Sequence, residues 1–252
     1  MSRKYTKRIK RKDIEIAQTE RNVTAIHEYI DKNKKNCSLF NLKPVKALTY
    51  PQQSMIDSMN NGMNIVADGS AGTGKTYISM FIALSMVLSK ECSQKRIIIV
   101  RSIVPSRDIG FLPGTIEEKL EPYETPYKDI TADLMSNPMA YEHLKGSKKI
   151  IFMPTSFIRG LTWDDAIIIM DEIQNYNWQE INSVMTRIGD NSKVMVVGDY
   201  MQTDLNKLKT DHSGMERFLN IVKKMSSFDY INFTKNDIVR SKIVKEWLEN
   251  ID

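Results

Sequence analysis

The sequence predicts a three-layer α/β fold, in which a mostly parallel sheet lies between two sets of helices. From about residue 45 onward, short apolar runs alternate with segments of helical pattern. Such alternation is typical of buried parallel strands joined by crossover helices. A second observation is the glycine-rich stretch GSAGTGKT (69–76), which follows one apolar run and precedes a long apolar segment. Together they indicate a doubly wound sheet with a glycine loop between a strand and a helix.

The apolar pattern also locates the individual elements. We expect strands near 63–68, 96–101, 149–153, 166–171, 193–198 and 229–233. We expect helices near 52–60, 76–90, 115–121, 178–188, 214–226 and 240–250. Thr115 and Glu118 form a capping-box pattern at the start of the third helix. Pro44 and Pro51 mark residues 42–53 as a linker into the core.

The N-terminal part differs from the rest of the chain. Val23, Ile26 and Ile30 recur at helical spacing within residues 13–43, with charged residues between them. We therefore expect residues 1–44 to form a basic tail and a small helical segment. Residues 45–252 are then long enough for one sizeable domain.

Composition is that of an ordinary globular protein, with 252 residues of which 41% are hydrophobic and 27% charged. The longest apolar runs, at 97–100 and 166–170, are too short to cross a bilayer. The N-terminus has no apolar stretch of the kind found in signal peptides. Cys37 and Cys92 show no metal-ligand spacing. We expect a reduced, cytoplasmic protein without a membrane partner.

Positive charge is concentrated at the N-terminus. Residues 1–12 hold seven Lys or Arg and no acid, so the rest of the chain carries about −2 of the net charge of +5. A basic arm of this kind can bind the phosphates of single-stranded nucleic acid. A disordered tail that only increases solubility is an equally good interpretation of the charge.

The glycine-rich loop fits the pattern G-x-x-x-x-G-K-[ST] at every fixed position. Backbone N–H groups of a loop without bulky side chains can surround phosphate oxygens, and Lys75 adds a charge between the β- and γ-phosphates. The Thr76 hydroxyl is a suitable Mg²⁺ ligand. A turn that binds nothing is the alternative, but the flanking strand and helix favour phosphate binding. We expect ATP and Mg²⁺ as cofactors, with the nucleotide held by Gly69, Ser70, Ala71, Gly72, Thr73, Gly74, Lys75 and Thr76.

The apolar run of the strand predicted at 166–171 ends in two acids, in the stretch AIIIMDEIQN. Parallel strands present their carboxyl ends at one edge of the sheet, so this pair should lie near the glycine loop. Asp171 suits Mg²⁺ binding, and Glu172 suits polarisation of an attacking water. Solvated acids at a strand end are the alternative, which the preceding phosphate loop makes less favourable.

Three further residues are candidates for the same site. Gln202 follows the strand at 193–198 and the Gly198-Asp199 turn, where a neutral amide can sense the γ-phosphate. Gln52, about twenty residues before the loop, can pair with an adenine edge, although a polar helix start would also explain it. Arg240 can stabilise charge on the γ-phosphate in the transition state, or it is a surface arginine.

The ordered motifs resemble those of PhoH-family ATPases, relatives of the first RecA-like domain of superfamily 1 helicases. The motifs are GSAGTGKT, GFLPG…EEKLEPY, SFIRGLTW, IIIMDEIQN, MTRIGDNSKVMVVGDYMQTDL and NDIVR, and they span roughly residues 45–250. The resemblance implies a RecA-like P-loop core and Mg²⁺-dependent ATP hydrolysis coupled to single-stranded nucleic acid, RNA more than DNA. Many members have Asp-Glu-Ala-Gln where this chain has Ile173 in the third position, a mild departure that keeps both acids.

The resemblance also implies oligomeric rings, most often hexamers with a central channel. From Gly69 to Asp252 there is room for one RecA-like domain only, so a neighbouring copy is expected to complete the ATP site. Arg240, Arg187 and Arg159 are the candidates to act across that interface. Residues 1–44 are too few for the nuclease domain that some relatives carry, and no KH-type segment is evident.

Two other functions are compatible with a phosphate loop. A small-molecule kinase would need an arginine-rich lid and an acceptor pocket, and neither is clear in the sequence. A nucleotide-switched binding protein would need no acid pair for hydrolysis. The segment 102–148 is the least informative part: Arg107, Phe111, Tyr123 and Tyr127 either clamp a single strand or pack against the sheet, and packing is favoured.

Overall fold

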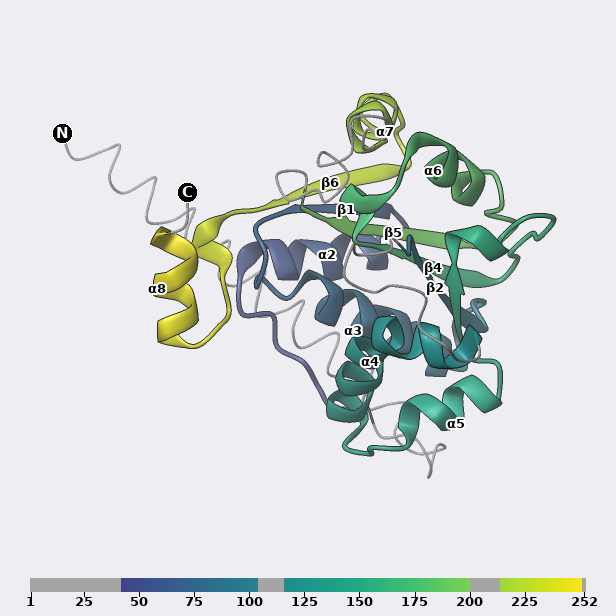
Figure 1. Cartoon of the computed structure of the whole chain (residues 1–252), viewed down its shortest axis with the longest axis horizontal. Coiled ribbons are helices and arrows are strands. Elements are labelled where there is room, and N and C mark those ends of the chain that lie inside the picture. Colours follow the sequence, from purple (N-terminus) through teal and green to yellow (C-terminus); the bar gives the residue numbers. More distant parts are fainter. Residues whose placement is uncertain (1–41, 104–115, 200–213, 251–252) are drawn as a thin grey trace.

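The computed structural model describes residues 42–103, 116–199 and 214–250, and its centre is a six-stranded sheet (Figure 1). All six strands lie within one or two residues of the predicted positions. They are β1 (Asn64–Gly69), β2 (Arg96–Arg101), β3 (Ile150–Pro154), β4 (Ala166–Asp171), β5 (Lys193–Gly198) and β6 (Phe228–Phe233). The basic tail and residues 13–41 of the helical segment predicted at 13–43 lie outside the described residues, and residues 42–43 are not helical.

The strands are arranged in the order β3-β2-β4-β5-β1-β6, and every pairing is parallel. Residues Ile97 to Val100 of β2 and Ile167 to Met170 of β4 are completely buried, as expected for strands covered on both faces. Because β4, β5 and β1 are neighbours, the segments that follow them emerge side by side at one edge of the sheet. The glycine loop and the acid pair are therefore brought together.

Helices cover both faces of the sheet (Figure 1). One face carries α2 (Tyr50–Asn60), α3 (Lys75–Leu88), α4 (Ile116–Met135) and α5 (Ala140–Gly146). The other face carries α6 (Trp178–Met185) and α7 (Met215–Val222). Alternate residues of one strand serve the two layers: Ile97 and Ile99 pack beneath α3, whereas Ile98 and Val100 pack toward α6. The predicted three-layer α/β architecture is confirmed.

The largest difference from the predicted elements is α4. The capping-box pattern predicts a helix over 115–121, but the helix runs to Met135 and includes Pro122 and Pro126. A proline inside a helix removes one backbone hydrogen bond and normally ends the helix. Here burial of Tyr127 and Leu134 in the core offsets that loss. The sequence also predicted no helix at 140–146, where α5 packs on α4.

The C-terminal helix α8 (Lys242–Asn250) stands away from the sheet at the end of β6 (Figure 1). Ile243 is 76% exposed and Trp247 is 68% exposed, so its apolar side chains are not buried within the chain. No helix in the described ranges is both long and apolar enough to pass through a membrane.

Candidate nucleotide-binding site

The glycine loop begins in close contact with the end of β6. Gly69 has φ 124°, and a Cβ atom built there would lie 1.9 Å from the Phe233 carbonyl oxygen. Ser70 N–H donates to that same carbonyl oxygen at 3.1 Å. Gly74 adopts the left-handed conformation, with φ 81°, where α3 begins. Only glycine allows both the close approach and these backbone angles, so the loop geometry follows from its glycines.

The side chain of Lys75 packs against the glycine loop. Its Nζ donates to the carbonyl oxygens of Gly69, at 2.7 Å, and Ser70, at 2.8 Å. The side chain is buried, and this burial lowers the pKa of Lys75, although the nearby carboxylates of Asp199 and Glu172 act in the opposite direction. The ammonium group is thus held among the loop carbonyls, where phosphate oxygens can replace them as partners.

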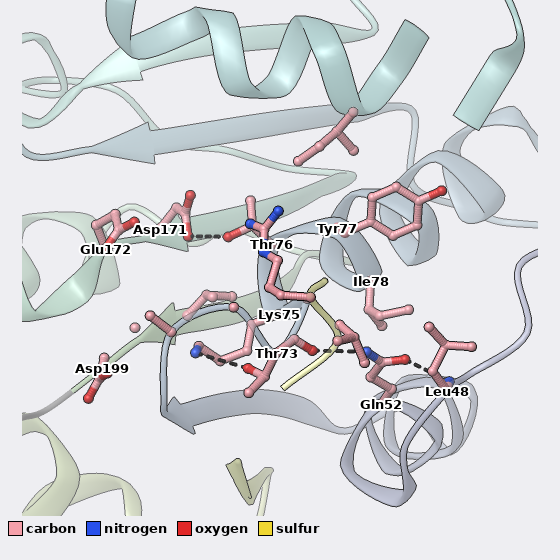
Figure 2. Close-up of a pocket in the computed structure, with 18 of the residues that line it drawn as sticks. Leu48, Gln52, Thr73, Lys75, Thr76, Tyr77, Ile78, Asp171, Glu172 and Asp199 are labelled. Carbon is pink, nitrogen blue, oxygen red and sulfur yellow. Dashed lines mark hydrogen bonds between the residues drawn. The ribbon is translucent and has the colours of Figure 1, made fainter. Parts of the chain in front are cut away.

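Thr76 meets Asp171 across the site, and their side chains point toward one another in Figure 2. The Thr76 hydroxyl donates to Asp171 Oδ1 at 3.0 Å. The second oxygen of Asp171 accepts from the Tyr127 hydroxyl at 2.7 Å. Burial and the neighbouring Glu172 raise the pKa of Asp171, while the hydrogen bonds from Tyr127 and Thr76 and the charge of Arg101 limit this rise.

Thr76 and Asp171 fit a magnesium site. Hydroxyl and carboxylate oxygens are ligands that this ion prefers, and protein sites for it usually combine one or two carboxylates with phosphates and water. Within the described residues no group of three or more His, Cys, Asp and Glu side chains could hold a metal ion. Thr76 and Asp171 supply two oxygen donors, and such a pair suits a cation whose other ligands are phosphate oxygens and water.

Glu172 follows Asp171 in a left-handed conformation with φ 55°. This uncommon angle turns the chain at the end of β4, and the Gln174 side-chain amide donates to Glu172 Oε2. Gln174 Oε1 accepts from the backbone N–H of Asp199 at 3.0 Å. One glutamine thus joins the acid pair after β4 to the turn after β5.

These elements surround a cavity of about 580 Å³ (Figure 2). Its volume suits a bound nucleotide, since ligand pockets typically measure about 300–1,000 Å³. One end holds the glycine loop and the carboxylates, and the other end is more apolar. The lining includes Val45, Leu48, Gln52, Lys75, Thr76, Ile130, Asp171, Glu172, Gln174, Asp199, Val239 and Arg240.

Gln52 contacts the glycine loop rather than open space. Its Nε2 donates to the Thr73 carbonyl oxygen at 2.9 Å, and its Oε1 accepts from Leu48 N–H at 2.8 Å. The side chain is 3% exposed. Both ends of the amide thus join the linker to the loop. The predicted adenine contact stays a prediction, and it would require the amide to exchange these partners.

The three candidate arginines lie in different places. Arg240 is exposed and lines the cavity of its own chain, next to Val239, whose N–H donates to Gly72 O at 3.0 Å. Arg159 is exposed in the segment that follows β3. Arg187 lies beside Trp163, whose N–H donates to its carbonyl oxygen at 2.8 Å. Both Trp163 and Arg187 precede strands, so Arg187 is at the opposite edge of the sheet from the glycine loop. Gln202 lies outside the described residues.

Sequence reasoning did not assign Tyr127 and Arg101 to the site. Tyr127 is completely buried, which confirms the packing interpretation for this residue, but its hydroxyl reaches Asp171 as well. Arg101 ends β2, directly opposite Asp171 in the strand register. Burial opposes its charge, yet attraction to Tyr127, Asp171 and Glu172 gives a net rise in the pKa of Arg101. No local pattern in the sequence signals either contact.

A family model described as PhoH-like protein matches residues 44–252. The chain belongs to the PhoH family. The match begins six residues before α2, which starts at Tyr50.

Curated PhoH proteins support the same assignment. A PhoH-like protein of Mycobacterium bovis is 34% identical over 205 residues, which cover 81% of this chain and 57% of that protein. A PhoH-like protein of Bacillus subtilis is 32% identical over 226 residues, covering 89% and 67%. Protein PhoH of Escherichia coli is 32% identical over 207 residues, covering 81% and 57%. The chain thus spans little more than half the length of most of these relatives.

The similarity to solved structures is weaker. The large terminase of a thermophilic bacteriophage has a TM-score of 0.48 at 14% identity, with coverage of 81% of this chain and 50% of that chain. The Pif1 helicase from Candida albicans has a TM-score of 0.38 at 15% identity, with coverage of 75% and 40%.

Proposed function

We propose that this PhoH-family protein binds ATP with Mg²⁺ and hydrolyses it. The observation that carries the proposal is the contact of Thr76 with Asp171 beside Lys75, on the floor of a nucleotide-sized cavity. Thr76 and Asp171 supply oxygen ligands, and Lys75 supplies positive charge to the phosphates. Magnesium, when bound, neutralises the charge that develops on the phosphate oxygens.

The residues around the phosphates have separate roles in this reaction. The backbone N–H groups of residues 70–75 and the start of α3 bind the phosphate chain. Glu172, held by Gln174, orients a water for in-line attack on the γ-phosphorus and receives its proton. Gln174 also contacts the backbone of Asp199, so a shift of the turn after β5 would move Glu172.

Arg240 is proposed to contact the phosphate or ribose of a nucleotide in its own chain, because it lines that cavity. The other proposed role, across an interface, is better suited to Arg187 or Arg159. Arg187 lies at the far edge of the sheet, from which it can approach only the site of another copy. We therefore propose a ring-shaped homo-oligomer, with the hexamer as the expected form and single-stranded RNA as the preferred ligand of its channel and basic tail.

The test is a measurement of ATP turnover with and without Mg²⁺, and with added single-stranded RNA or DNA, on samples whose oligomer mass is recorded. Mg²⁺-dependent phosphate release that rises with single-stranded nucleic acid in an oligomer supports the whole proposal. Full turnover by a strict monomer would contradict the oligomer. Tight binding of ATP without phosphate release, with or without nucleic acid, would favour a nucleotide-switched binding protein instead.

A further inference from the structure

We propose that Tyr127 is a positioning residue for the magnesium site, a role that rests on the proposed function. Its hydroxyl holds Asp171 Oδ2 at 2.7 Å, while Thr76 contacts Asp171 Oδ1 at 3.0 Å. The two donors approach different oxygens of one buried carboxylate. Tyr127 thereby fixes the carboxylate plane and leaves Oδ1, the oxygen beside Thr76, as the one that faces the cation.

The ring of Tyr127 is held firmly enough to do this. The side chain is completely buried, and its ring lies 5.9 Å from that of Phe152, tilted by 42°. It comes from α4, whereas Asp171 ends β4 and Thr76 belongs to α3. Side chains from three separate elements therefore meet at the Asp171 carboxylate. Because the Tyr127 ring is fixed by packing, its hydroxyl restricts rotation of that carboxylate.

Packing alone does not explain the hydroxyl. Tyr141 is also buried in the same core cluster, yet its hydroxyl has no hydrogen-bond partner among the described residues. Tyr176, buried on the other face, donates to the Val100 carbonyl oxygen at 2.7 Å. This core thus accommodates tyrosines with no partner or with a backbone partner. Of these three, Tyr127 is the one whose hydroxyl reaches a proposed metal ligand.

The hydroxyl is also a dependable donor. A phenolic O–H group keeps its proton at neutral pH, so Tyr127 acts as the donor and the Asp171 oxygen as the acceptor. Arg101 lies directly opposite Asp171 in the strand register, on the neighbouring strand β2. The carboxylate is consequently held in one orientation by groups that do not themselves exchange with the nucleotide.

Tyr127→Phe tests this role, with Tyr141→Phe as the matched control. Each change removes one buried hydroxyl from the same core cluster and keeps the ring. Binding of the fluorescent analogue mant-ATP is measured in EDTA and then across a Mg²⁺ titration. Turnover is measured over the same titration, and the thermal midpoint is recorded for each protein.

We expect Tyr127→Phe to raise the Mg²⁺ concentration needed for half-maximal tight binding by about tenfold, as is typical when a group behind a metal ligand is lost. Its mant-ATP affinity in EDTA should equal that of the parent, and Tyr141→Phe should match the parent in Mg²⁺ dependence and in turnover. An unchanged Mg²⁺ dependence, or the same shift in both variants, would overturn the positioning role. A parent protein without any Mg²⁺ dependence would overturn the proposed function as well, so the two failures are distinguishable.

Discussion

The Thr76 hydroxyl donates to Asp171 Oδ1 at 3.0 Å although the two residues are 95 positions apart in the chain. The contact exists because β1 and β4 are separated in the sheet by β5 alone and run in the same direction. It joins the start of α3, directly after the glycine loop, to the end of β4. Two parts of the chain that are far apart in sequence thus meet at one end of the sheet.

Replacement of Lys75 by Ala should weaken ATP binding by at least about tenfold, because charge-assisted contacts to phosphate are worth roughly 1.5–3 kcal/mol. The nucleotide-free protein should keep its thermal stability, since burial lowers the pKa of Lys75 and so disfavours its charged form. Isothermal titration with ATP and a melting curve test both points. Unchanged ATP affinity would remove Lys75 from the phosphate site.

Replacement of Asp171 by Asn should raise the melting temperature of the nucleotide-free protein at neutral pH by a few degrees. The pKa of Asp171 is raised in the folded state, first by burial and then by Glu172, so the folded chain binds its proton more tightly than the unfolded chain does. The destabilisation is therefore fully present above the folded pKa and disappears below the unfolded one.

The pH dependence supplies the check on that variant. The difference in melting temperature between Asp171→Asn and the parent should be largest at neutral pH and should shrink as the solution is acidified. The same variant should lose Mg²⁺-dependent turnover. A variant that melts below the parent at neutral pH would show that the charged carboxylate stabilises the free site.

Replacement of Gly69 by Ala should destabilise the protein by at least about 2 kcal/mol and abolish ATP binding. The added Cβ would lie 1.9 Å from the Phe233 carbonyl oxygen, so β6 or the loop must move. Gly146→Ala is the control, because nothing lies within 4 Å of its Cβ position, and it should change stability by no more than about 0.5 kcal/mol. Chemical denaturation measures both, and equal stability of the two variants would contradict the close approach.

Replacement of Gln52 by Ala should lower stability by about 1 kcal/mol and weaken ATP and GTP binding equally, because its amide braces the Thr73 carbonyl and the Leu48 N–H. Gln53→Ala is the control, since Gln53 donates to Asp57 within α2. Competition binding with the two nucleotides distinguishes the alternatives. A loss confined to ATP would instead support the predicted adenine contact.

The sheet and the positions of the glycine loop and the acid pair were predictable because their signals are local. A buried run such as IIIV at 97–100, or a glycine loop at 69–76, carries its own periodicity and spacing. The length of α4 was not predictable in this way. Pro122 and Pro126 signal a helix end, and only burial of Tyr127 and Leu134 against other elements outweighs that signal.

The two neighbours of Asp171 that the sequence analysis missed were hidden for a related reason. Tyr127 and Arg101 act on Asp171 through contacts between α4, β2 and β4, and their distance in sequence gives no spacing to recognise. The amide of Gln52 contacts two backbone groups of the linker and loop that the sequence did not indicate, while its predicted adenine contact stays a prediction. Such contacts depend on which elements pack together. The periodicity of the sequence does not give that information.

The most direct test of the central claim is single-turnover release of phosphate from radiolabelled ATP by the parent and by Glu172→Gln, each with Mg²⁺. The left-handed turn and the Gln174 contact place Glu172 beside the cavity, and glutamine preserves its size while removing the charge that activates water. We predict that the variant binds ATP like the parent and releases phosphate at least about 100-fold more slowly. Phosphate release at the parental rate would contradict the assignment of Glu172 and the hydrolytic site built around it.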